Sequence, residues 1–280
     1  MRIGNLDGRL VILTDNGALD VARASAGRFG PEPQAIYPRW QEFVGWAADV
    51  SDAAAELYEL DLLRAPAPAP RQSFGIGLNY RDHVTESGFA VPDQPSVFTK
   101  FPSCITGPIG DVVLPPGGHT DWEVELVAVI GITARGVAEA DAWRHVAGLT
   151  VGQDISERIS QLAGSPPQFS LGKSFPGFGP TGPWLVTIDE FADPDDLELG
   201  CSVNGDQMQK SRTSYLIISV PQLIARLSAV VTLLPGDIIF TGTPAGVGMG
   251  REPQRWLAPG DELVSYVDGI GELRQHFVAG

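Results

Sequence analysis

The amino-acid sequence predicts an α+β protein that is mainly β, with a small N-terminal domain ahead of a larger body. Its 280 residues include 33 glycines and 23 prolines, an excess that favours turns and short strands over a helical bundle. Short apolar segments recur along the chain without the regular alternation of strand and helix that is typical of a parallel sheet. A proline-rich stretch at 65–70 is the best domain boundary.

The N-terminal domain comprises residues 1–70. Within it, 9–14 has the composition of a strand and is followed by an Asn-Gly turn. Residues 40–60 are expected to form a helical stretch. The alternating alanines and prolines of 65–70 then predict a stiff, extended linker that leads to the body at 71–280.

The body is expected to contain several strands and two helices. The predicted strand segments are 73–80, 95–101, 123–131, 184–188, 197–205, 237–243 and 262–277. One helix is expected at 138–146 and another at 219–231, where Ser219 suits an N-cap and Pro221 suits the first turn. This order of elements is mixed, so we expect a body that is mainly β.

The charge and composition exclude several classes of function. A net charge of −15 argues against nucleic acid or an anionic membrane as a partner, because both require a positive surface. No apolar run approaches the length of a membrane span, and the N-terminal segment lacks the apolar region of a signal peptide. Cys104 and Cys201 are far apart in the chain and suit a reducing compartment as buried thiols. The sequence therefore predicts a cytoplasmic protein.

Two glutamates at the start of an apolar strand form the first candidate site. Glu123 and Glu125 are two residues apart and should project from the same face of the strand. Paired carboxylates on a buried strand repel each other and lose solvation, and a divalent cation removes both penalties. The alternative is an edge strand whose glutamates face water.

A third carboxylate, Asp154, follows an apolar strand that ends at Gln153. It could complete a site of three oxygen ligands, which select Mg²⁺, Mn²⁺ or Ca²⁺ over Zn²⁺ or copper. The alternative is that Asp154 caps the following turn.

A histidine and a glutamate form the next candidate pair. Gly88 suits a helix C-cap, so 82–87 is expected to form a short helical turn with His83 and Glu86 on one face. The carboxylate would then orient the imidazole as a general base for water. The alternative is a surface ion pair.

Several cationic and amide side chains are candidate contacts for a substrate carboxylate or a developing enolate. They are Lys100, Arg158, Gln161 and Lys173. The alternative for each cation is a solvated surface position. The segment 177–182 matches the Gly-x-Gly-x-x-Gly pattern of dinucleotide binding, but it leads into a strand instead of a helix, so that function is excluded.

Taken together, these segments resemble the fumarylacetoacetate hydrolase family, and in particular its bacterial acylpyruvate hydrolase-like members. The stretches that carry the resemblance are GLNYRDHVTESG, PSVFTKFPSCITGP, DWEVELVAVIG, LTVGQDISERISQ, LGKSFPGFGPTGPWLVT, SVNGDQMQKSRTS and LLPGDIIFTGTPAGVG. They occur in the family's order, and the resemblance covers about residues 72–280.

The resemblance implies a mixed β-roll that forms a homodimer and binds Mg²⁺ or Mn²⁺. The implied metal ligands are Glu123, Glu125 and Asp154, the implied catalytic residues are His83, Glu86 and Lys173, and the implied substrate contacts are Arg158, Gln161, Gly242 and Thr243, to which the sequence context adds Lys100. The first 70 residues are similar to the variable N-terminal unit of bacterial members.

Three segments depart from the family's pattern. Gln153 stands where Asn is common, Glu157-Arg158-Ile159 stands where the family has Ala-Arg-Asp, and Pro176-Gly177 replaces an Asp-Thr pair. We expect these departures to line the substrate pocket.

The implied function is metal-dependent hydrolysis of a carbon–carbon bond in a small β-diketo acid, such as an acylpyruvate or fumarylpyruvate. The same groups would serve an oxaloacetate decarboxylase or a keto–enol isomerase, since neither reaction needs an activated water. A third alternative is a keto-acid-binding protein that has lost catalysis. The segment 83–90 could be a fixed helix or a lid that orders on binding.

Overall fold

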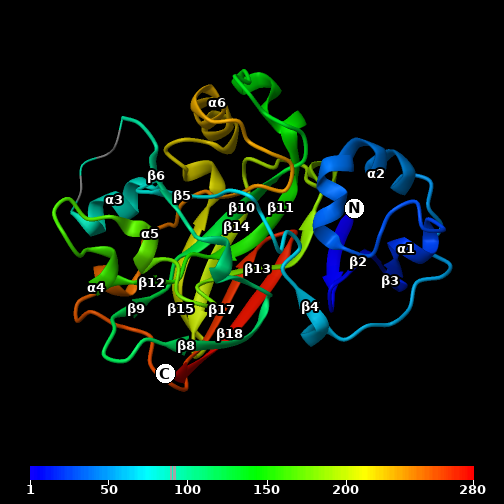
Figure 1. The fold of residues 1–280 in the computed structure, drawn as a ribbon. Coiled ribbons are helices and arrows are strands. Elements are labelled where there is room, and N and C mark those ends of the chain that lie inside the picture. Colours follow the sequence, from blue (N-terminus) through cyan, green and yellow to red (C-terminus); the bar gives the residue numbers. More distant parts are fainter. Residues whose placement is uncertain (89, 91–92) are drawn as a thin grey trace.

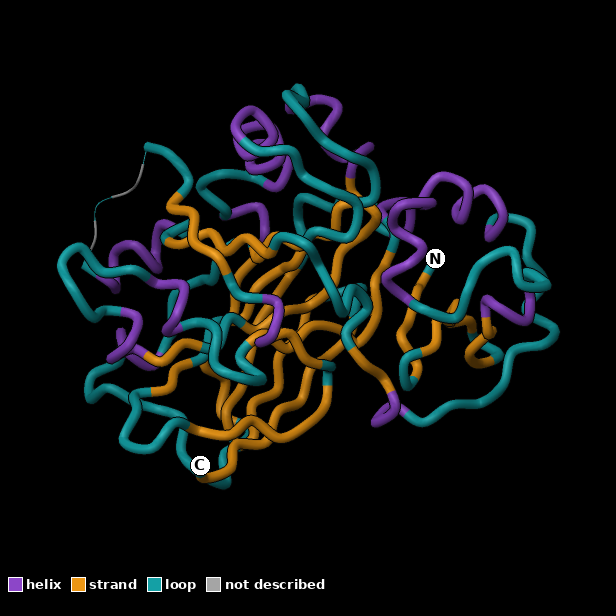
Figure 2. The backbone as a smooth tube through the Cα atoms, in the orientation of Figure 1, coloured by secondary structure: helices purple, strands orange, loops and turns teal. Residues whose placement is uncertain are grey.

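Two β-sheets packed against each other form the centre of the molecule, with helices at their margins (Figure 1). The computed structural model describes residues 1–88, 90 and 93–280. Figure 2 shows that strands dominate the centre of the molecule, whereas the helices are short and peripheral. The predicted α+β class, mainly β, is confirmed.

In the described part of the chain, the larger sheet has eleven strands. Its main path has the order β3 (Gly17–Asp20), β2 (Arg9–Thr14), β1 (Arg2–Leu6), β13 (Gly179–Val186), β11 (Val146–Gln153), β10 (Val124–Ile130), β16 (Ile238–Phe240), β5 (Ser73–Gly77) and β6 (Ser96–Thr99), with β4 (Leu63–Arg64) paired to β1 and β7 (Ile105–Thr106) paired to β13. Because β16 and β5 are parallel whereas β10 and β11 are antiparallel, the sheet is mixed.

The smaller sheet contains, in order, β15 (Asp206–Arg212), β14 (Glu198–Val203), β17 (Glu262–Val267), β18 (Gly271–Ala279) and β8 (Ile109–Leu114), and a separate pair joins β9 (Thr120–Asp121) to β12 (Ser156–Glu157). The α-helices are α1 (Val21–Ala24), α2 (Trp40–Ala47), α3 (Arg81–Ser87), α4 (Arg158–Gln161), α5 (Phe169–Gly172) and α6 (Val220–Val230). Short 3₁₀ helices occupy Pro33–Arg39, Leu60–Leu62, Pro102–Cys104, Glu139–His145, Ile188–Glu190, Thr213–Tyr215 and Gly248–Gly250.

Strand β10 is the centre of the fold and is buried along its whole length. It pairs with β11 on one side and β16 on the other. Leu126 packs into the core between the two sheets, whereas Val127 and Val129 pack into the core shared with the N-terminal segment. Because side chains alternate along a strand, Glu123 and Glu125 lie on the same face as Val127. The alternative of a water-facing edge strand is therefore excluded.

The N-terminal segment joins the larger sheet directly. Ile3 of β1 lies opposite Leu185 of β13. The segment 65–70 contacts the N-terminal strands, since Asn5 Nδ2 donates to the Ala65 carbonyl at 2.8 Å. Strands from both sides of the predicted domain boundary thus belong to the same sheet. The division into domains at 1–70 and 71–280 stays a prediction.

The predicted helix over 40–60 is wrong beyond Ala47, where α2 ends. The Ser51 hydroxyl accepts a hydrogen bond from a backbone N–H two residues on, which competes with helix formation. Glu56 then exchanges two backbone hydrogen bonds with Ala18 of β3, at 2.8 and 3.0 Å. The chain at Glu56 therefore pairs with the edge of the β2–β3 hairpin and does not continue the helix.

The other predicted elements are found. Each predicted strand segment of the body contains a strand, and α6 begins at a capping box formed by Ser219 and Gln222. The helix expected at 138–146 is a 3₁₀ helix. Strand β15 was missed because its sequence, DQMQKSR, is polar and forms a strand only by pairing with β14. Over the described residues, no helix is both long enough and apolar enough to cross a membrane.

Candidate metal centre and active site

Three acidic side chains from two neighbouring strands converge in the interior. Glu123 precedes β10, Glu125 lies within it, and Asp154 follows β11. The two strands pair with Val124 opposite Gln153, which brings all three carboxylates to one place. A ligand oxygen from each lies within 4.8 Å of the others, and all three side chains are buried. The structure thus brings together the predicted triad.

The carboxylates of the triad have unequal electrostatic environments. Burial would raise the pKa of Glu123, but the charges of Lys173 and Arg158 outweigh burial and lower that pKa to about 2. Burial raises the pKa of Glu125, and the neighbouring charges of Asp154 and Glu123 raise it further. Among the described residues, no cation forms a salt bridge with Glu125. Its carboxylate accepts one hydrogen bond from a backbone N–H, at 2.7 Å.

This donor set fits a hard divalent cation. Three buried carboxylates offer only oxygen atoms, which are the ligands that Mg²⁺ and Mn²⁺ prefer. A cation held between Glu123, Glu125 and Asp154 would also compensate the negative charge of Glu125, for which the described residues supply no ion pair.

Lys173 approaches two of the three carboxylates. Its Nζ lies 2.7 Å from Glu123 Oε2 and 2.6 Å from Asp154 Oδ2. Burial would lower the pKa of Lys173, but the charges of Asp154 and Glu123 outweigh burial and raise it. Lys173 is thus a protonated donor at the wall of a pocket.

Lys100 lies behind Asp154 instead of at the pocket wall. Its ammonium group is fully buried and donates to Asp154 Oδ1 at 2.6 Å and to the backbone carbonyl of Lys173. Lys100 was predicted to contact substrate directly, but in this position it does not line the pocket. The two lysine bonds also show that the Asp154 carboxylate binds cations and does not cap the turn that follows it.

Gly242 and Thr243 support the triad from the segment that follows β16. The Gly242 N–H donates to Glu125 Oε2 at 2.7 Å. A Cβ at this position would come within 2.6 Å of the Asn79 side chain, and its φ of +107° favours glycine. Thr243 lines the pocket, and its hydroxyl donates to the Val124 carbonyl at 2.9 Å.

Arg158 and Gln161 begin and end α4, and both line the pocket. Arg158 Nη1 donates to Glu123 Oε1 at 2.6 Å and to Gln161 Oε1 at 2.8 Å. Its Nε and Nη2 donate to Asp121 Oδ2 at 2.9 and 2.6 Å. The guanidinium group is therefore held by the protein on both edges. Neither Arg158 nor Gln161 is a solvated surface group.

Asp121 was not singled out from the sequence. Besides holding Arg158, its carboxylate accepts hydrogen bonds from the backbone N–H groups of Gly248 at 2.6 Å and Met249 at 3.0 Å. It therefore connects α4 to the 3₁₀ helix Gly248–Gly250, which places Met249 in the pocket wall. The available signal was the acidic pattern Asp-x-Glu-x-Glu that begins at 121.

Asp121→Asn is expected to destabilise the protein and to raise KM. The amide would place donors where Arg158 and two backbone N–H groups already donate, and breaking a buried ion pair costs about 3–5 kcal/mol. Urea denaturation should show a lower midpoint with an unchanged slope. Asp111→Asn, at an exposed position on β8, is the control and should leave both the stability and KM unchanged. Wild-type stability of Asp121→Asn would contradict this role.

The predicted acid–base pair lies on α3. Gly88 ends the helix with a φ of +71°, and His83 Nδ1 lies 2.8 Å from Glu86 Oε1. His83 is only 7% exposed, so the alternative of a surface ion pair is excluded. Glu86 Oε2 also accepts from the Gly246 N–H at 2.9 Å. With Nδ1–H donating to Glu86, the other ring nitrogen is left as an acceptor.

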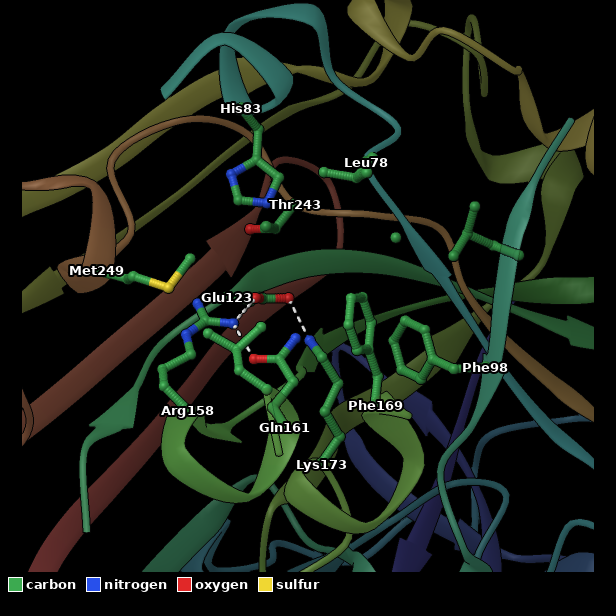
Figure 3. Close-up of a pocket in the computed structure, with 13 residues that line it drawn as sticks. Leu78, His83, Phe98, Glu123, Arg158, Gln161, Phe169, Lys173, Thr243 and Met249 are labelled. Carbon is green, nitrogen blue, oxygen red and sulfur yellow. Dashed lines mark hydrogen bonds and ion pairs between the residues drawn. The ribbon is translucent and has the colours of Figure 1, made fainter. Parts of the chain in front are cut away.

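One pocket is lined by both His83 of the acid–base pair and Glu123 of the triad. Figure 3 shows His83 at its top, with Glu123, Arg158 and Lys173 below. The pocket contains about 450 Å³ of empty space, including open solvent at its mouth. Its lining is Ile76, Gly77, Leu78, His83, Phe98, Glu123, Arg158, Gln161, Leu162, Phe169, Lys173, Thr243 and Met249.

The family departures do not line this pocket, so that prediction is wrong. Gln153 is fully buried, where it accepts from the Glu123 N–H at 2.8 Å and donates to Ser265 Oγ at 2.9 Å. Ile159 is 54% exposed on the outer side of α4. Pro176-Gly177 is also absent from the lining. Gln153 instead supports the backbone of Glu123, and Ile159 lies on the surface.

The fold and the site together define a class of β-rich proteins with a three-carboxylate centre beside a His–Glu pair. The Fumarylacetoacetate (FAA) hydrolase C-terminal family matches residues 72–278, and the chain therefore belongs to this family. The family resemblance carried by the sequence motifs is confirmed.

Three relatives illustrate the range of the family. Oxaloacetate tautomerase FAHD2A, a mitochondrial protein of Bos taurus, is 45% identical over 210 residues, which cover 75% of this chain and 67% of the relative. A provisionally named HpcE protein of Mycobacterium smegmatis is 56% identical, and its crystal structure covers 100% of both chains with a TM-score of 0.95. Maleylpyruvate hydrolase from Sphingobium sp. SYK-6, crystallised with manganese(II) and pyruvate, is 30% identical over 100% of both chains with a TM-score of 0.79.

Proposed function

We propose that this protein is a divalent-metal-dependent hydrolase that cleaves a carbon–carbon bond in a small β-diketo acid of the acylpyruvate or fumarylpyruvate kind. The observation that carries the proposal is the buried triad of Glu123, Glu125 and Asp154 together with the His83–Glu86 pair, since Glu123 and His83 line the same pocket. The manganese and pyruvate of the maleylpyruvate hydrolase structure support it. We propose Mg²⁺ or Mn²⁺ as the cation and, from the family resemblance, a homodimer.

The charged end of the pocket would hold the keto acid. A divalent cation bound by the triad would supply Lewis-acid polarisation of the substrate's keto and carboxylate oxygens. Lys173, kept protonated by its carboxylate neighbours, donates toward the negative charge that develops during the reaction. Arg158 keeps Glu123 and Gln161 in place through two hydrogen bonds.

The acid–base pair would activate the water. His83 takes a proton from water while Glu86 holds the opposite ring nitrogen. The hydroxide adds to the distal carbonyl carbon, and the bond between that carbon and the methylene group breaks. The electron pair passes to the methylene carbon and the adjoining keto group, and His83 returns the proton to that carbon. The products are a carboxylic acid and the shorter keto acid, so one water is consumed for each bond broken.

Tautomerisation or decarboxylation of oxaloacetate is the second candidate. The identity to oxaloacetate tautomerase FAHD2A favours it, and the charged end of the pocket would serve it without any activated water. A keto-acid-binding protein without catalysis is a third candidate, against which the intact triad and His83–Glu86 pair both count.

A substrate screen with product identification tests the proposal. The purified protein, supplied with Mg²⁺ or Mn²⁺, should convert an acylpyruvate to a carboxylic acid and pyruvate. Release of CO₂ from oxaloacetate, or loss of enol absorbance without a new product, would favour the second candidate. Tight binding of keto acids with no turnover of any compound would reject the enzyme proposals.

A further inference from the structure

The pocket has a charged part and an apolar part, which suit different groups of a substrate. Glu123, Arg158 and Lys173 form the charged part, below His83 (Figure 3). Figure 3 also shows Phe98 and Phe169 beside Lys173. The apolar members of the lining are Ile76, Leu78, Phe98, Leu162, Phe169 and Met249. A substrate whose keto acid end occupies the charged part would extend its other end along these side chains.

Both cations of the pocket lining are already paired with protein carboxylates. Lys173 bonds to Glu123 and Asp154, and Arg158 bonds to Asp121 and Glu123. The described lining includes no further lysine or arginine. The pocket therefore presents no free cation to a second carboxylate of a substrate.

Two other cations, Lys100 and Arg81, are not part of this lining. Lys100 is fully buried behind Asp154. Arg81, at the start of α3, lines a different pocket together with Lys210 and Tyr215. Neither side chain is placed to neutralise a charge beside Phe98 or Phe169.

The charge balance of the centre leaves room for one substrate anion. The cations are Lys100, Arg158 and Lys173, and the carboxylates are Asp121, Glu123, Glu125 and Asp154. With all four carboxylates ionised, as metal binding would require of the triad, three positive and four negative groups give −1, and a divalent cation would change this to +1. One keto acid carboxylate brings the sum to zero. A second carboxylate would be uncompensated in a poorly solvated space, at a large cost.

The aromatic side of the pocket is fixed by packing. The Phe98 ring covers the backbone of Gly75 in β5, where a Cβ would come within 2.2 Å of the ring. The ring centroids of Phe98 and Phe169 are 6.0 Å apart at an interplanar angle of 61°, and Lys173 Nζ lies 4.9 Å from the Phe98 centroid. This wall adjoins the charged part directly and offers no polar hydrogen-bond donor.

We propose that the pocket selects monoanionic β-diketo acids with an uncharged, apolar acyl group and discriminates against dicarboxylates. This inference rests on the proposed function, and it narrows the substrate class. It separates this chain from relatives whose names specify the dicarboxylates oxaloacetate and maleylpyruvate.

Binding of two unreactive keto acids of the same shape tests the inference. Calorimetry with Mg²⁺- or Mn²⁺-loaded protein should compare 2-oxoglutarate with 5-methyl-2-oxohexanoate, in which an isopropyl group replaces the distal carboxylate. The isopropyl compound should bind at least about tenfold more tightly, because it buries two methyl groups where the other buries an unpaired charge. Equal or tighter binding of 2-oxoglutarate would overturn the proposal.

A cation placed in the apolar part should reverse this preference. Phe169→Arg should increase the relative affinity for 2-oxoglutarate by about tenfold or more, whereas Phe169→Leu should not. Leu162→Arg, at a position 42% exposed on the rim, decides the matter should Phe169→Arg fail to fold. If neither folded arginine variant changes the ratio, the proposal is wrong.

Turnover distinguishes this inference from the proposed function. Preference for the isopropyl compound without hydrolysis of any acylpyruvate would leave the inference standing and reject the hydrolase. Hydrolysis of acylpyruvates together with tight binding of 2-oxoglutarate would support the hydrolase and reject the inference about substrate charge.

Discussion

Glu125→Gln is expected to abolish the response of the protein to divalent cations while leaving the metal-free protein more stable than the wild type. The glutamine oxygen can still accept from the Gly242 N–H, and its NH₂ group can donate to the neighbouring carboxylates. Removing an uncompensated buried charge should add about 1–3 kcal/mol to the free energy of unfolding at neutral or higher pH. Mg²⁺ or Mn²⁺ should raise the Tm of the wild type but not of the variant.

Activity and metal binding should fall together in this variant. Loss of Lewis-acid assistance is worth several kcal/mol, so kcat/KM should fall by about a thousandfold or more. Calorimetric titration with Mn²⁺ should detect no binding at the concentrations that saturate the wild type. Retention of the Mn²⁺ heat, or of activity, would show that Glu125 is not a ligand.

The pH dependence of stability provides a second readout for Glu125. Its pKa is raised in the folded protein by burial and by neighbouring negative charges, so the folded state keeps a proton that the unfolded state releases at lower pH. The wild-type free energy of unfolding without metal should therefore fall as pH rises from the ordinary glutamate pKa to the raised one. Glu125→Gln should lack this contribution.

Glu123→Gln is the matched control, because it removes a carboxylate that does have cation partners. Lys173 and Arg158 would each lose a charged partner within 2.7 Å. The metal-free variant should be destabilised by about 3–5 kcal/mol, the opposite sign to Glu125→Gln. Equal effects of the two substitutions on unfolding would contradict the unequal environments described for these carboxylates.

His83→Gln is expected to lower kcat for hydrolysis by about 10²–10⁴-fold while binding of an unreactive keto acid stays close to that of the wild type. The substitution removes the group that accepts the proton of water, whereas the triad and Lys173 are untouched. Single-turnover rates with an acylpyruvate and calorimetric titration with a keto acid would separate the two effects.

Glu86→Gln is the companion variant. It keeps a side chain that can accept from Gly246 but removes the negative charge beside His83. We expect a smaller loss of kcat, together with a shift of the pH–rate profile that His83→Gln cannot show.

If His83→Gln retains full kcat in hydrolysis, the assignment of the general base is wrong. Retained tautomerisation with lost hydrolysis would instead confine His83 to the water-dependent reaction.

The paired glutamates of the triad could be predicted from local spacing, whereas the assignment of Asp154 to the triad came from the family resemblance. Glu123 and Glu125 share a face because a strand repeats every two residues, and the apolar residues that follow them require burial. His83 and Glu86 meet because a helical turn brings positions i and i+3 together, and Gly88 ends that turn. These relationships depend on neighbours in the chain, so no tertiary information was needed.

The partners of the cations could not be predicted in this way. Lys100, Arg158 and Lys173 were all predicted to contact substrate, but whether a cation faces a ligand or a protein carboxylate depends on segments far away in the chain. Lys100 bonds to Asp154 across 54 residues, and Arg158 bonds to Asp121 across 37 residues. The same limit explains why the family departures at Gln153 and Ile159 were wrongly placed in the pocket.

The sequence by itself determined the α+β class, the family and the members of the triad and of the His–Glu pair, because each depends on short spacings and on an ordered series of motifs. Only the tertiary structure decided which cations are already neutralised, how the N-terminal strands join the larger sheet, and which side chains form the apolar part of the pocket. Those features arise from contacts between residues distant in the chain, and a linear pattern does not record which distant residues meet.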